Sequence, residues 1–291
     1  MIQKILYFIY AARVKTLIAS LSPIVITSAF CYKFYSFNFN ICLYTILAAM
    51  LIQIMTNYIN DLYDYKKGAD NNRVGPERMI QKGYLSENEI VKAIYLVLFI
   101  SLLIGIYLAS IGGILIIIIG LSSFLFAYLY TATQFSIAYN GLGEIFVFIY
   151  FGLVASFGTC YLQILEYNNY ALLIGIICGS LNVCLLIINN LRDIDSDKSS
   201  HKYTLIARYG KFFGYFEFSF FIILVYIGLY YFTIFISNKL LFYSALSLII
   251  IPIFILFLSI KSSYFLNKKA LPLMSMYITL FTLLLTFIII K

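Results

Sequence analysis

The sequence predicts an all-α, polytopic membrane protein in which nine transmembrane helices form a single domain over residues 1–291. Hydrophobic residues make up 63% of the chain and charged residues only 11%, whereas a soluble domain is about half apolar and about one quarter charged. The apolar residues recur in long runs along the whole chain, and an apolar run of about 18 or more residues can cross a bilayer as a helix. Lys and Arg gather in alternate connections, as they do in membrane proteins.

Nine apolar runs are long enough to cross the membrane. Most connections between them are short, but polar loops of about 30 and about 20 residues follow the second and the sixth run. Long loops in a compact domain are usually functional or disordered. The predicted spans are 16–34, 41–60, 91–111, 113–131, 143–163, 170–190, 213–236, 240–260 and 271–290.

The basic residues predict the orientation of the chain. With the N-terminus inside, every Lys and Arg except Lys33, Lys239 and Lys291 falls in an inside segment, which fits the positive-inside rule. We therefore expect a multi-pass protein of the cell membrane (inner or plasma membrane) with both polar loops in the cytoplasm. The net charge of +8 then reflects topology. Because no RNA- or DNA-binding motif accompanies it, we expect no nucleic-acid partner.

The five cysteines stand singly in or beside apolar runs, and no CxxC pair occurs. We read them as small buried hydrophobic residues rather than as a disulfide framework or a zinc site.

Two rows of oxygen-bearing side chains close the second and the sixth apolar run, in "NYINDLYDYKKGAD" (57–70) and "NNLRDIDSDK" (189–198). Side chains three or four residues apart share one helix face. We call Asn57, Asp61 and Asp64 the first acidic row, and Asn189, Asp193 and Asp197 the second acidic row. We expect the two rows to face each other across a central cavity.

Carboxylate and amide oxygens without nearby His or Cys suit a hard cation, Mg²⁺ above all, and Mn²⁺ is expected to substitute for it. Magnesium prefers a few carboxylates together with substrate phosphates, and arginine grips phosphate bidentately. The rows and their cations therefore predict a metal site that stabilises a departing diphosphate; a solvated ion pair at the interface is the alternative reading of either row alone. The nearby cations are Lys66, Lys67, Arg73, Arg78, Arg192, Lys202 and Arg208.

The lipid surroundings and the 27 Tyr and 27 Phe residues suit a substrate with an isoprenoid tail. An allylic carbocation left by the diphosphate would be stabilised by aromatic faces. Ordinary packing is the competing role for each aromatic candidate. These candidates are Tyr128, Tyr130, Tyr139 and Phe148.

With these residues identified, the sequence resembles the UbiA-type intramembrane prenyltransferases, and within them most closely the branch that acts on 1,4-dihydroxy-2-naphthoate. Four blocks of the first 210 residues carry the likeness. The blocks that match are "AARVKTLIASLSP" (11–23), "NYINDLYDYKKGAD" with "RVGPERMIQKGYLS" (73–86), "YNGLGEIFVFIYFG" (139–152) and "NNLRDIDSDKSSHKYTLIARYG" (189–210).

The resemblance implies the UbiA prenyltransferase fold, with nine helices around a central cavity open to the lipid. It also implies Mg²⁺-dependent transfer of a polyprenyl chain from prenyl diphosphate to 1,4-dihydroxy-2-naphthoate, with decarboxylation to demethylmenaquinone. The family's metal-binding motifs map onto Asn57, Asp61 and Asp64, with Asp70 following, and onto Asp193 and Asp197, with Asn189 one turn earlier. By likeness, the cations on the diphosphate are Lys66, Arg73, Lys202 and Arg208.

Glu144, at the start of the fifth run, has two possible roles: a favourable charge at a helix N-terminus, or a group that orients or deprotonates the aromatic acceptor beside Tyr139. Other functions also stay open. Within the family, the acceptor could be 4-hydroxybenzoate or a lipid glycerol. A secondary transporter also carries intramembrane acids, although here they lie at helix ends. A CDP-alcohol phosphotransferase would need a DGxxAR run, which the sequence lacks.

The predicted orientation can be tested with a single engineered thiol. A cysteine at Ser199, in the second polar loop, should react with an impermeant thiol reagent in inverted vesicles but not in intact cells, since that loop is expected inside. Labelling of Ser199→Cys from outside would contradict the orientation.

Overall fold

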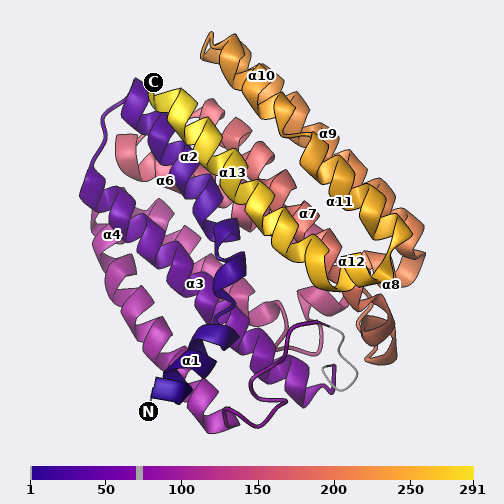
Figure 1. Cartoon of the computed structure of the whole chain (residues 1–291). Coiled ribbons are helices and arrows are strands. Elements are labelled where there is room, and N and C mark those ends of the chain that lie inside the picture. The colour runs from indigo at the N-terminus through magenta and orange to yellow at the C-terminus, as the bar shows by residue number, and fades with distance from the viewer. Residues whose placement is uncertain (1, 70–74) are drawn as a thin grey trace.

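A computed structural model describes residues 2–69 and 75–291, and all of its regular elements over these residues are helices (Figure 1). The all-α class is therefore confirmed. In chain order, the elements are α1 (Ile2–Ala11), η1 (Val14–Thr16), α2 (Ile18–Phe34), α3 (Phe39–Lys66), α4 (Glu87–Leu129), η2 (Ile137–Tyr139), α5 (Gly143–Phe148), η3 (Ile149–Val154), α6 (Ala155–Ile164), α7 (Asn169–Ser199), α8 (Leu205–Tyr209), α9 (Lys211–Phe235), α10 (Lys239–Ser247), α11 (Ile250–Lys261), α12 (Ser263–Phe265), η4 (Leu266–Ala270) and α13 (Leu271–Ile290).

Seven of the described helices are long and apolar enough to cross a membrane, or eight if the pair that bends by 54° at the start of the chain forms one span. A multi-pass membrane protein is thus supported, whereas nine separate spans are not established. The difference arises in α4, whose 43 residues take up two predicted spans, 91–111 and 113–131.

The helix α4 is broken at Gly113, which has φ 61° and ψ −150°. Such angles lie in a region of backbone space that is open mainly to glycine. Ala127, beyond the break, shares a hydrophobic cluster with Ile94 and Val97, before it. In a straight helix, residues 30 or more positions apart would be about 45 Å apart. The chain therefore folds back at Gly113, and both halves of α4 pack beside α3.

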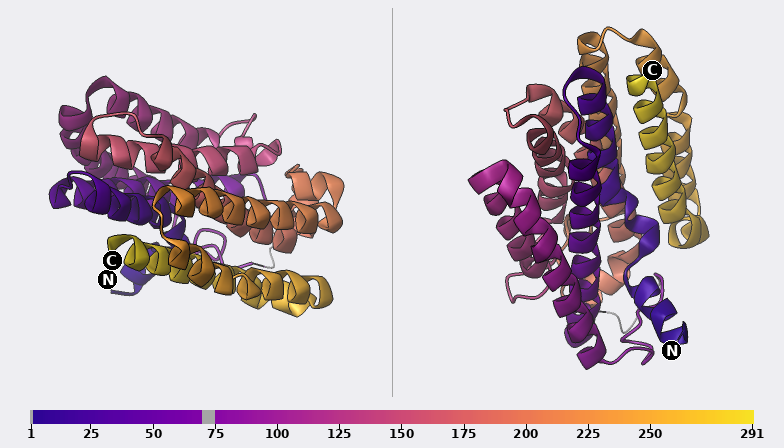
Figure 2. Two further views of the ribbon diagram at one scale, coloured as in Figure 1. Left: turned by 90° about the horizontal axis from the view of Figure 1, so that it is seen from above. Right: turned by 90° about the vertical axis from the view of Figure 1, so that its left-hand side faces the viewer.

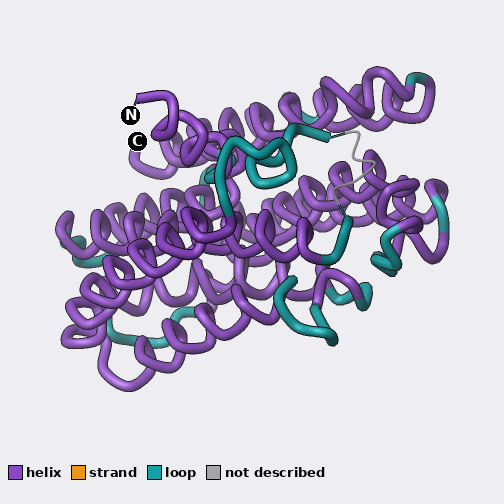
Figure 3. The backbone as a smooth tube through the Cα atoms, turned by 90° about the horizontal axis from the view of Figure 1, so that it is seen from below, coloured by secondary structure: helices purple, strands orange, loops and turns teal. Residues whose placement is uncertain are grey.

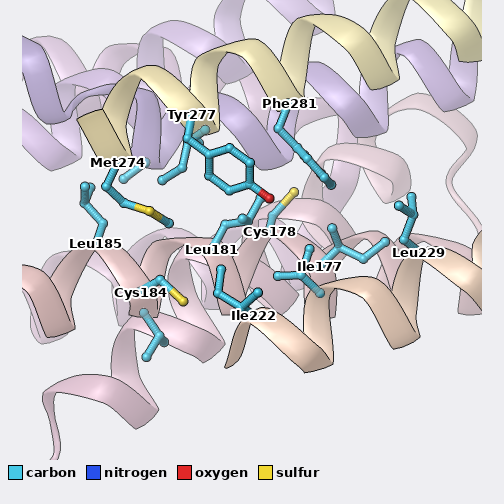
Figure 4. Packing of buried hydrophobic residues seen from close by; sticks show 14 of the residues in the cluster. Ile177, Cys178, Leu181, Cys184, Leu185, Ile222, Leu229, Met274, Tyr277 and Phe281 are labelled. Atoms are coloured by element: carbon cyan, nitrogen blue, oxygen red, sulfur yellow. The ribbon is translucent and has the colours of Figure 1, made fainter. Parts of the chain in front are cut away.

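The helix α7 is the most deeply buried of the membrane-capable helices. It packs against α2, α5, α6, α9 and α13. The two termini lie at opposite ends of the bundle (Figure 1 and the right-hand view of Figure 2). In the core, Leu181 of α7 lies with Ile222 of α9 and Tyr277 of α13 (Figure 4). The five cysteines are free and buried, so their interpretation as small core residues is confirmed.

Both acidic helices continue past their apolar runs, α3 to Lys66 and α7 to Ser199. The acidic rows are consequently helical, and the loops are shorter than predicted: 67–86 after α3, and 200–210, which contains α8, after α7. Residues 67–69, 75–86 and 200–210 lie at the end of the bundle where α1 begins (Figure 1), and Figure 3 draws the loops among them in teal. We call this the site end.

Three glycines bring the backbone of α5 and η3 directly against α7. A Cβ added to Gly152 would lie 2.5 Å from the carbonyl oxygen of Gly175, and one added to Gly179 would lie 2.7 Å from that of Phe148. Only glycine, which has no Cβ, therefore fits at these positions. This close contact sets the position of Glu144 relative to α7.

Gly179→Ala should lower the thermal stability of the protein in detergent, because overpacking a tight interface costs about 1–3 kcal/mol. Gly105→Ala is the matched control: a Cβ at Gly105, in α4, would meet nothing within 4 Å, so the gain in helix propensity should leave the melting temperature unchanged or higher. Equal melting temperatures for Gly179→Ala and the wild type would contradict the close contact.

Candidate functional site

The acidic rows lie at the site end, on the last turns of α3 and the last turns of α7. The four aspartates and Asn57 are all buried, with Asp61 only 1% exposed, and Asn189 is half-buried. Carboxylates buried to this degree need cations or hydrogen-bond donors beside them. The partners of each row therefore define the site.

Arg78, from the loop after α3, covers the first acidic row. Its Nη1 lies 3.6 Å from Asp61 Oδ1 and its Nη2 lies 3.3 Å from Asp64 Oδ2. The phenol of Tyr139 donates a hydrogen bond to Asp64 Oδ1 at 3.0 Å. Asn57 Nδ2 donates to the carbonyl of Ala12 at 2.9 Å, which holds the chain near the N-terminus against α3.

The second acidic row has cations of its own. Arg192 donates from Nε and Nη2 to the two carboxylate oxygens of Asp193, at 2.7 and 2.6 Å, and from Nη2 to Asn189 Oδ1 at 2.6 Å. Lys202 Nζ lies 3.5 Å from Asp197 Oδ1. The other oxygen of Asp197, Oδ2, is buried and has no hydrogen-bond partner.

Tyr139 lies between the two rows. Its hydroxyl bonds to Asp64, while its ring faces the Nζ of Lys67 at 4.2 Å and the Nζ of Lys202, the partner of Asp197, at 5.8 Å from the ring centroid. Its carbonyl accepts a hydrogen bond from the backbone N–H of Tyr203, in the second loop, at 3.0 Å. One aromatic residue thus touches the first row and the cation of the second.

Two further contacts join the elements that carry the rows. Ser196 Oγ of α7 donates to the carbonyl of Ala69, just after α3, at 3.1 Å. A Cβ added to Gly75, in the first loop, would lie 2.8 Å from Arg192 Nη2, so this loop passes directly over the guanidinium. The structure therefore brings the two rows into one site at the site end.

The adjacent lysines after the first row differ in role. Lys67 Nζ donates to the carbonyls of Thr131 and Thr133 at 2.7 and 2.8 Å and to Ser136 Oγ at 3.0 Å. Burial lowers the pKa of Lys67; nearby Asp64 opposes this effect and Lys202 adds to it. Lys66 instead forms an exposed ion pair with Glu87 at 3.2 Å, which directs it away from the rows.

The remaining predicted residues lie at different distances from this centre. Arg208 is exposed and donates to the carbonyls of Tyr203 and Asn140, and Tyr128 lies against Tyr63 rather than at the rows. Glu144 is buried and accepts a hydrogen bond from Asn190 Nδ2 at 3.0 Å. Asp70 and Arg73 lie outside the described residues.

An apolar cavity of about 540 Å³ lies between α3, both halves of α4, and the α5–α6 segment. Tyr130 lines it, and the Tyr130 hydroxyl lies 3.3 Å from where a Cβ of Gly143 would be, beside Glu144. Phe146 and Tyr150 line the cavity further from the site end. The volume is in the range of small-molecule sites, which are concave and mostly apolar with few polar groups.

Within residues 2–69 and 75–291, no group of three or more His, Cys, Asp or Glu side chains is close enough to hold a metal ion. Arginine and lysine occupy the carboxylate oxygens instead. The donors nevertheless fit a hard cation, because the four aspartates are buried oxygen ligands and Asp197 Oδ2 has no partner.

The sequence analysis did not predict three polar residues of the site, Asn60, Asn190 and Ser196. Asn60 accepts a hydrogen bond from Thr131 Oγ1 at 2.7 Å. All three are buried within the two acidic helices. The adjacent asparagines in "NNLRD" were a signal for Asn190, since a second amide in an apolar run requires a partner.

Comparison with known proteins assigns the class. Residues 20–281 match the UbiA prenyltransferase family. The chain is 34% identical over 203 residues to a 1,4-dihydroxy-2-naphthoate octaprenyltransferase of Mycobacterium leprae, covering 70% of this chain and 69% of the relative. It is 35% identical over 219 residues to the protein of that name from Haemophilus influenzae, with the same two coverages.

A solved UbiA homologue from Archaeoglobus fulgidus, bound to GPP and Mg²⁺, superposes with a TM-score of 0.67 at 15% identity, over 98% of this chain and 99% of that chain. The chain belongs to the UbiA prenyltransferase family. It is therefore a membrane-embedded transferase, which sets aside the secondary transporter and the CDP-alcohol phosphotransferase.

The different surroundings of the two lysines predict different costs of removing them. Lys67→Met loses three charge-assisted hydrogen bonds and should lower the free energy of unfolding by about 1.5–3 kcal/mol or more. Lys66→Met, the neighbouring control, removes only an exposed ion pair and should change it by less than about 1 kcal/mol. Denaturation in detergent measures both. Equal effects of the two substitutions would contradict the assigned roles.

Proposed function

We propose that this protein transfers a polyprenyl chain from prenyl diphosphate to 1,4-dihydroxy-2-naphthoate with loss of carbon dioxide and diphosphate, giving demethylmenaquinol, the reduced form of demethylmenaquinone. The observation that carries the proposal is the pairing of two buried acidic rows around Tyr139 with an apolar cavity that begins at Tyr130. The names of the relatives from Mycobacterium leprae and Haemophilus influenzae support the naphthoate as acceptor.

Asn57, Asp61, Asp64, Asp193 and Asp197 would hold Mg²⁺, with Mn²⁺ as its substitute. When bound, Mg²⁺ neutralises the negative charge that develops on the departing diphosphate. The Mg²⁺ and GPP named with the Archaeoglobus fulgidus homologue support this assignment. Ion pairs with the row aspartates hold Arg78, Arg192 and Lys202 at the rows in the structure. In this position they can move from carboxylate to diphosphate oxygens, for which arginine has a matching fork of donors.

The outer cations have a secondary place in this scheme. Arg208 is held at the exposed rim by the carbonyls of Tyr203 and Asn140, where it can attract an anionic substrate before it reaches the rows. Arg73 stays a candidate by resemblance alone. Lys66, paired with Glu87, would have to leave that partner to touch a diphosphate.

The isoprenoid tail would occupy the apolar cavity. Its allylic carbon would then lie near Tyr130, at the end of the cavity that is next to Glu144. The ring of Tyr139 already faces two ammonium groups, so this aromatic face accepts positive charge. Tyr130 and Tyr139 would stabilise the allylic carbocation by cation–π contact.

The electron-rich ring of the acceptor attacks the allylic carbon through the carbon that bears its carboxylate. A carbon–carbon bond forms there, the bond to the carboxylate breaks, and its electron pair restores the aromatic ring as carbon dioxide leaves. Glu144, held by Asn190, would orient the acceptor.

We also propose how the site lies in the membrane. The fold-back of α4 at Gly113 would make two crossings of that helix. With the bent pair at the start of the chain counted as one span, this would give nine spans. The concentration of Lys and Arg at the site end would place the acidic rows on the cytoplasmic side of the cell membrane.

Asp61→Asn and Asp193→Asn should each lower the rate of prenyl transfer by orders of magnitude, because each removes a charged ligand from one row. Asp195→Asn is the matched control, since Asp195 lies between the second-row positions of α7 but is exposed. Product formation with saturating substrates measures the effect. EDTA should abolish prenyl transfer by the wild type, and Mg²⁺ or Mn²⁺ should restore it. Near-normal rates for either row variant would rule out the shared site.

The fate of the acceptor carboxyl group distinguishes the naphthoate from 4-hydroxybenzoate. With each acid labelled at its carboxyl carbon, we expect labelled carbon dioxide, in step with diphosphate, from the naphthoate alone. A benzoate enzyme attaches the chain beside the hydroxyl and keeps the carboxylate. A prenylated product that retains the label would move the protein to the benzoate branch.

A further inference from the structure

Glu217 of α9 is a buried acid that the scheme above does not use. Its side chain is 7% exposed, and its Oε2 atom is buried without a hydrogen-bond partner. A carboxyl group in such a position carries a desolvation cost that nothing in the fold offsets. Ionisable residues inside a membrane bundle are functional by default, so the open oxygen of Glu217 points to a ligand.

The packing of α9 against α5 sets the level of Glu217 in the bundle. Phe148 and Phe221 are in contact, with ring centroids 6.1 Å apart. Each phenylalanine follows a glutamate by four residues, Glu144 in α5 and Glu217 in α9. Both helices begin at the site end, and residues four apart lie one above the other on a helix face. The two carboxyl groups therefore lie about one turn above the Phe148–Phe221 contact, at matching levels.

The helix α7 lies beside the segments that carry Glu144 and Glu217. Asn190 donates to Glu144 Oε1 at 3.0 Å. The neighbouring Leu191 side chain lies 2.8 Å from where a Cβ of Gly214 would be, one turn before Glu217. Tyr215 points the other way, since its hydroxyl donates to the carbonyl of Ser259 in α11. Glu217 thus faces α5 and α7 rather than α11.

We propose that Glu217, together with Glu144 and Asn190, forms a subsite that binds a ring hydroxyl of the aromatic acceptor; this inference rests on the proposed function. A buried carboxyl oxygen without a donor is the natural partner of a phenolic O–H. An unpaired buried carboxyl group takes up a proton rather than hold its charge, and its carbonyl oxygen then accepts a hydrogen bond. Accepting this proton in a hydrogen bond leaves more electron density on the phenolic oxygen, and thus on the ring carbon that attacks the allylic cation.

The cations at the rows fix the direction in which the acceptor binds. Arg78, Arg192 and Lys202 at the rows attract the carboxylate of the acceptor, whereas Glu144 and Glu217 offer it no positive charge. The hydroxyl therefore points toward Glu217 and the carboxylate points toward the site end. An acceptor without a ring hydroxyl cannot use the Glu217 subsite.

The test measures binding of the acceptor without prenyl diphosphate, by calorimetry on the full chain in detergent. The probes are 1,4-dihydroxy-2-naphthoate and 2-naphthoate, which lacks both hydroxyls. Glu217→Leu should weaken binding of the dihydroxy acid by about tenfold or more, because it removes the acceptor and leaves the phenolic O–H without a partner. Glu217→Gln keeps a carbonyl acceptor and should weaken binding less. Binding of 2-naphthoate should not change. Glu166→Gln, which changes an exposed acid in the connection between α6 and α7, is the control and should bind both probes like the wild type.

Unchanged binding of the dihydroxy acid in both Glu217 variants would overturn the inference, as would equal weakening of both probes, which would indicate a role in folding. The proposed function is judged separately by prenyl transfer in the wild type. Transfer by the wild type with unaffected variants would leave the function standing and remove the subsite. Hydroxyl-specific binding without transfer would remove the function and leave the subsite.

Discussion

The burial of four carboxylates at one end of an apolar bundle is the constraint on which the rest of the structure depends. Asp61, Asp64, Asp193 and Asp197 cannot lie there as isolated charges, because desolvation of an unpaired carboxylate costs several kcal/mol. The chain meets this cost with cations from outside the apolar helices: Arg78 from the first loop and Lys202 from the second. The two loops are therefore folded down onto the helix ends by electrostatics, and Tyr139 is fixed between them. Three cations therefore lie against the four carboxylates without substrate, and under the proposed function a diphosphate would recruit them.

The acidic rows were predictable because helical spacing is a local property. Residues four apart share a face wherever the helix forms, so Asn57 and Asp61, or Asp193 and Asp197, needed no knowledge of the tertiary fold. The partners were not predictable in the same way. Nothing in the sequence distinguishes Lys66 from Lys67, although one forms an exposed pair with Glu87 and the other ties the 131–136 segment to the site. The direction of one residue at a helix C-terminus decides between them.

The fold was predictable in class but less so in its breaks. Apolar runs identify membrane-capable helices, and two such runs predicted the two halves of α4. The break between them at Gly113 depends on a glycine conformation that composition does not reveal. The close contacts of Gly152 and Gly179 with neighbouring backbone could not be predicted from the sequence, since a glycine in a membrane helix does not show which neighbouring helix it faces. Glu217 was overlooked for a related reason: a single acid in an aromatic helix has no repeat to mark it, and only the contact between Phe148 and Phe221 shows that it lies level with Glu144.

The central claim is that both rows act on one ligand, and a double-mutant cycle tests it most directly. The measurement is the affinity of the purified protein for a prenyl diphosphate in the presence of Mg²⁺, for the wild type, Asp64→Asn, Asp197→Asn and the double variant. Residues that share one network have interaction energies of about 0.5–3 kcal/mol, whereas distant independent sites are additive. A shared site predicts coupling within that range between these positions on α3 and α7. Strict additivity of the two effects, or an effect from one row alone, would contradict it.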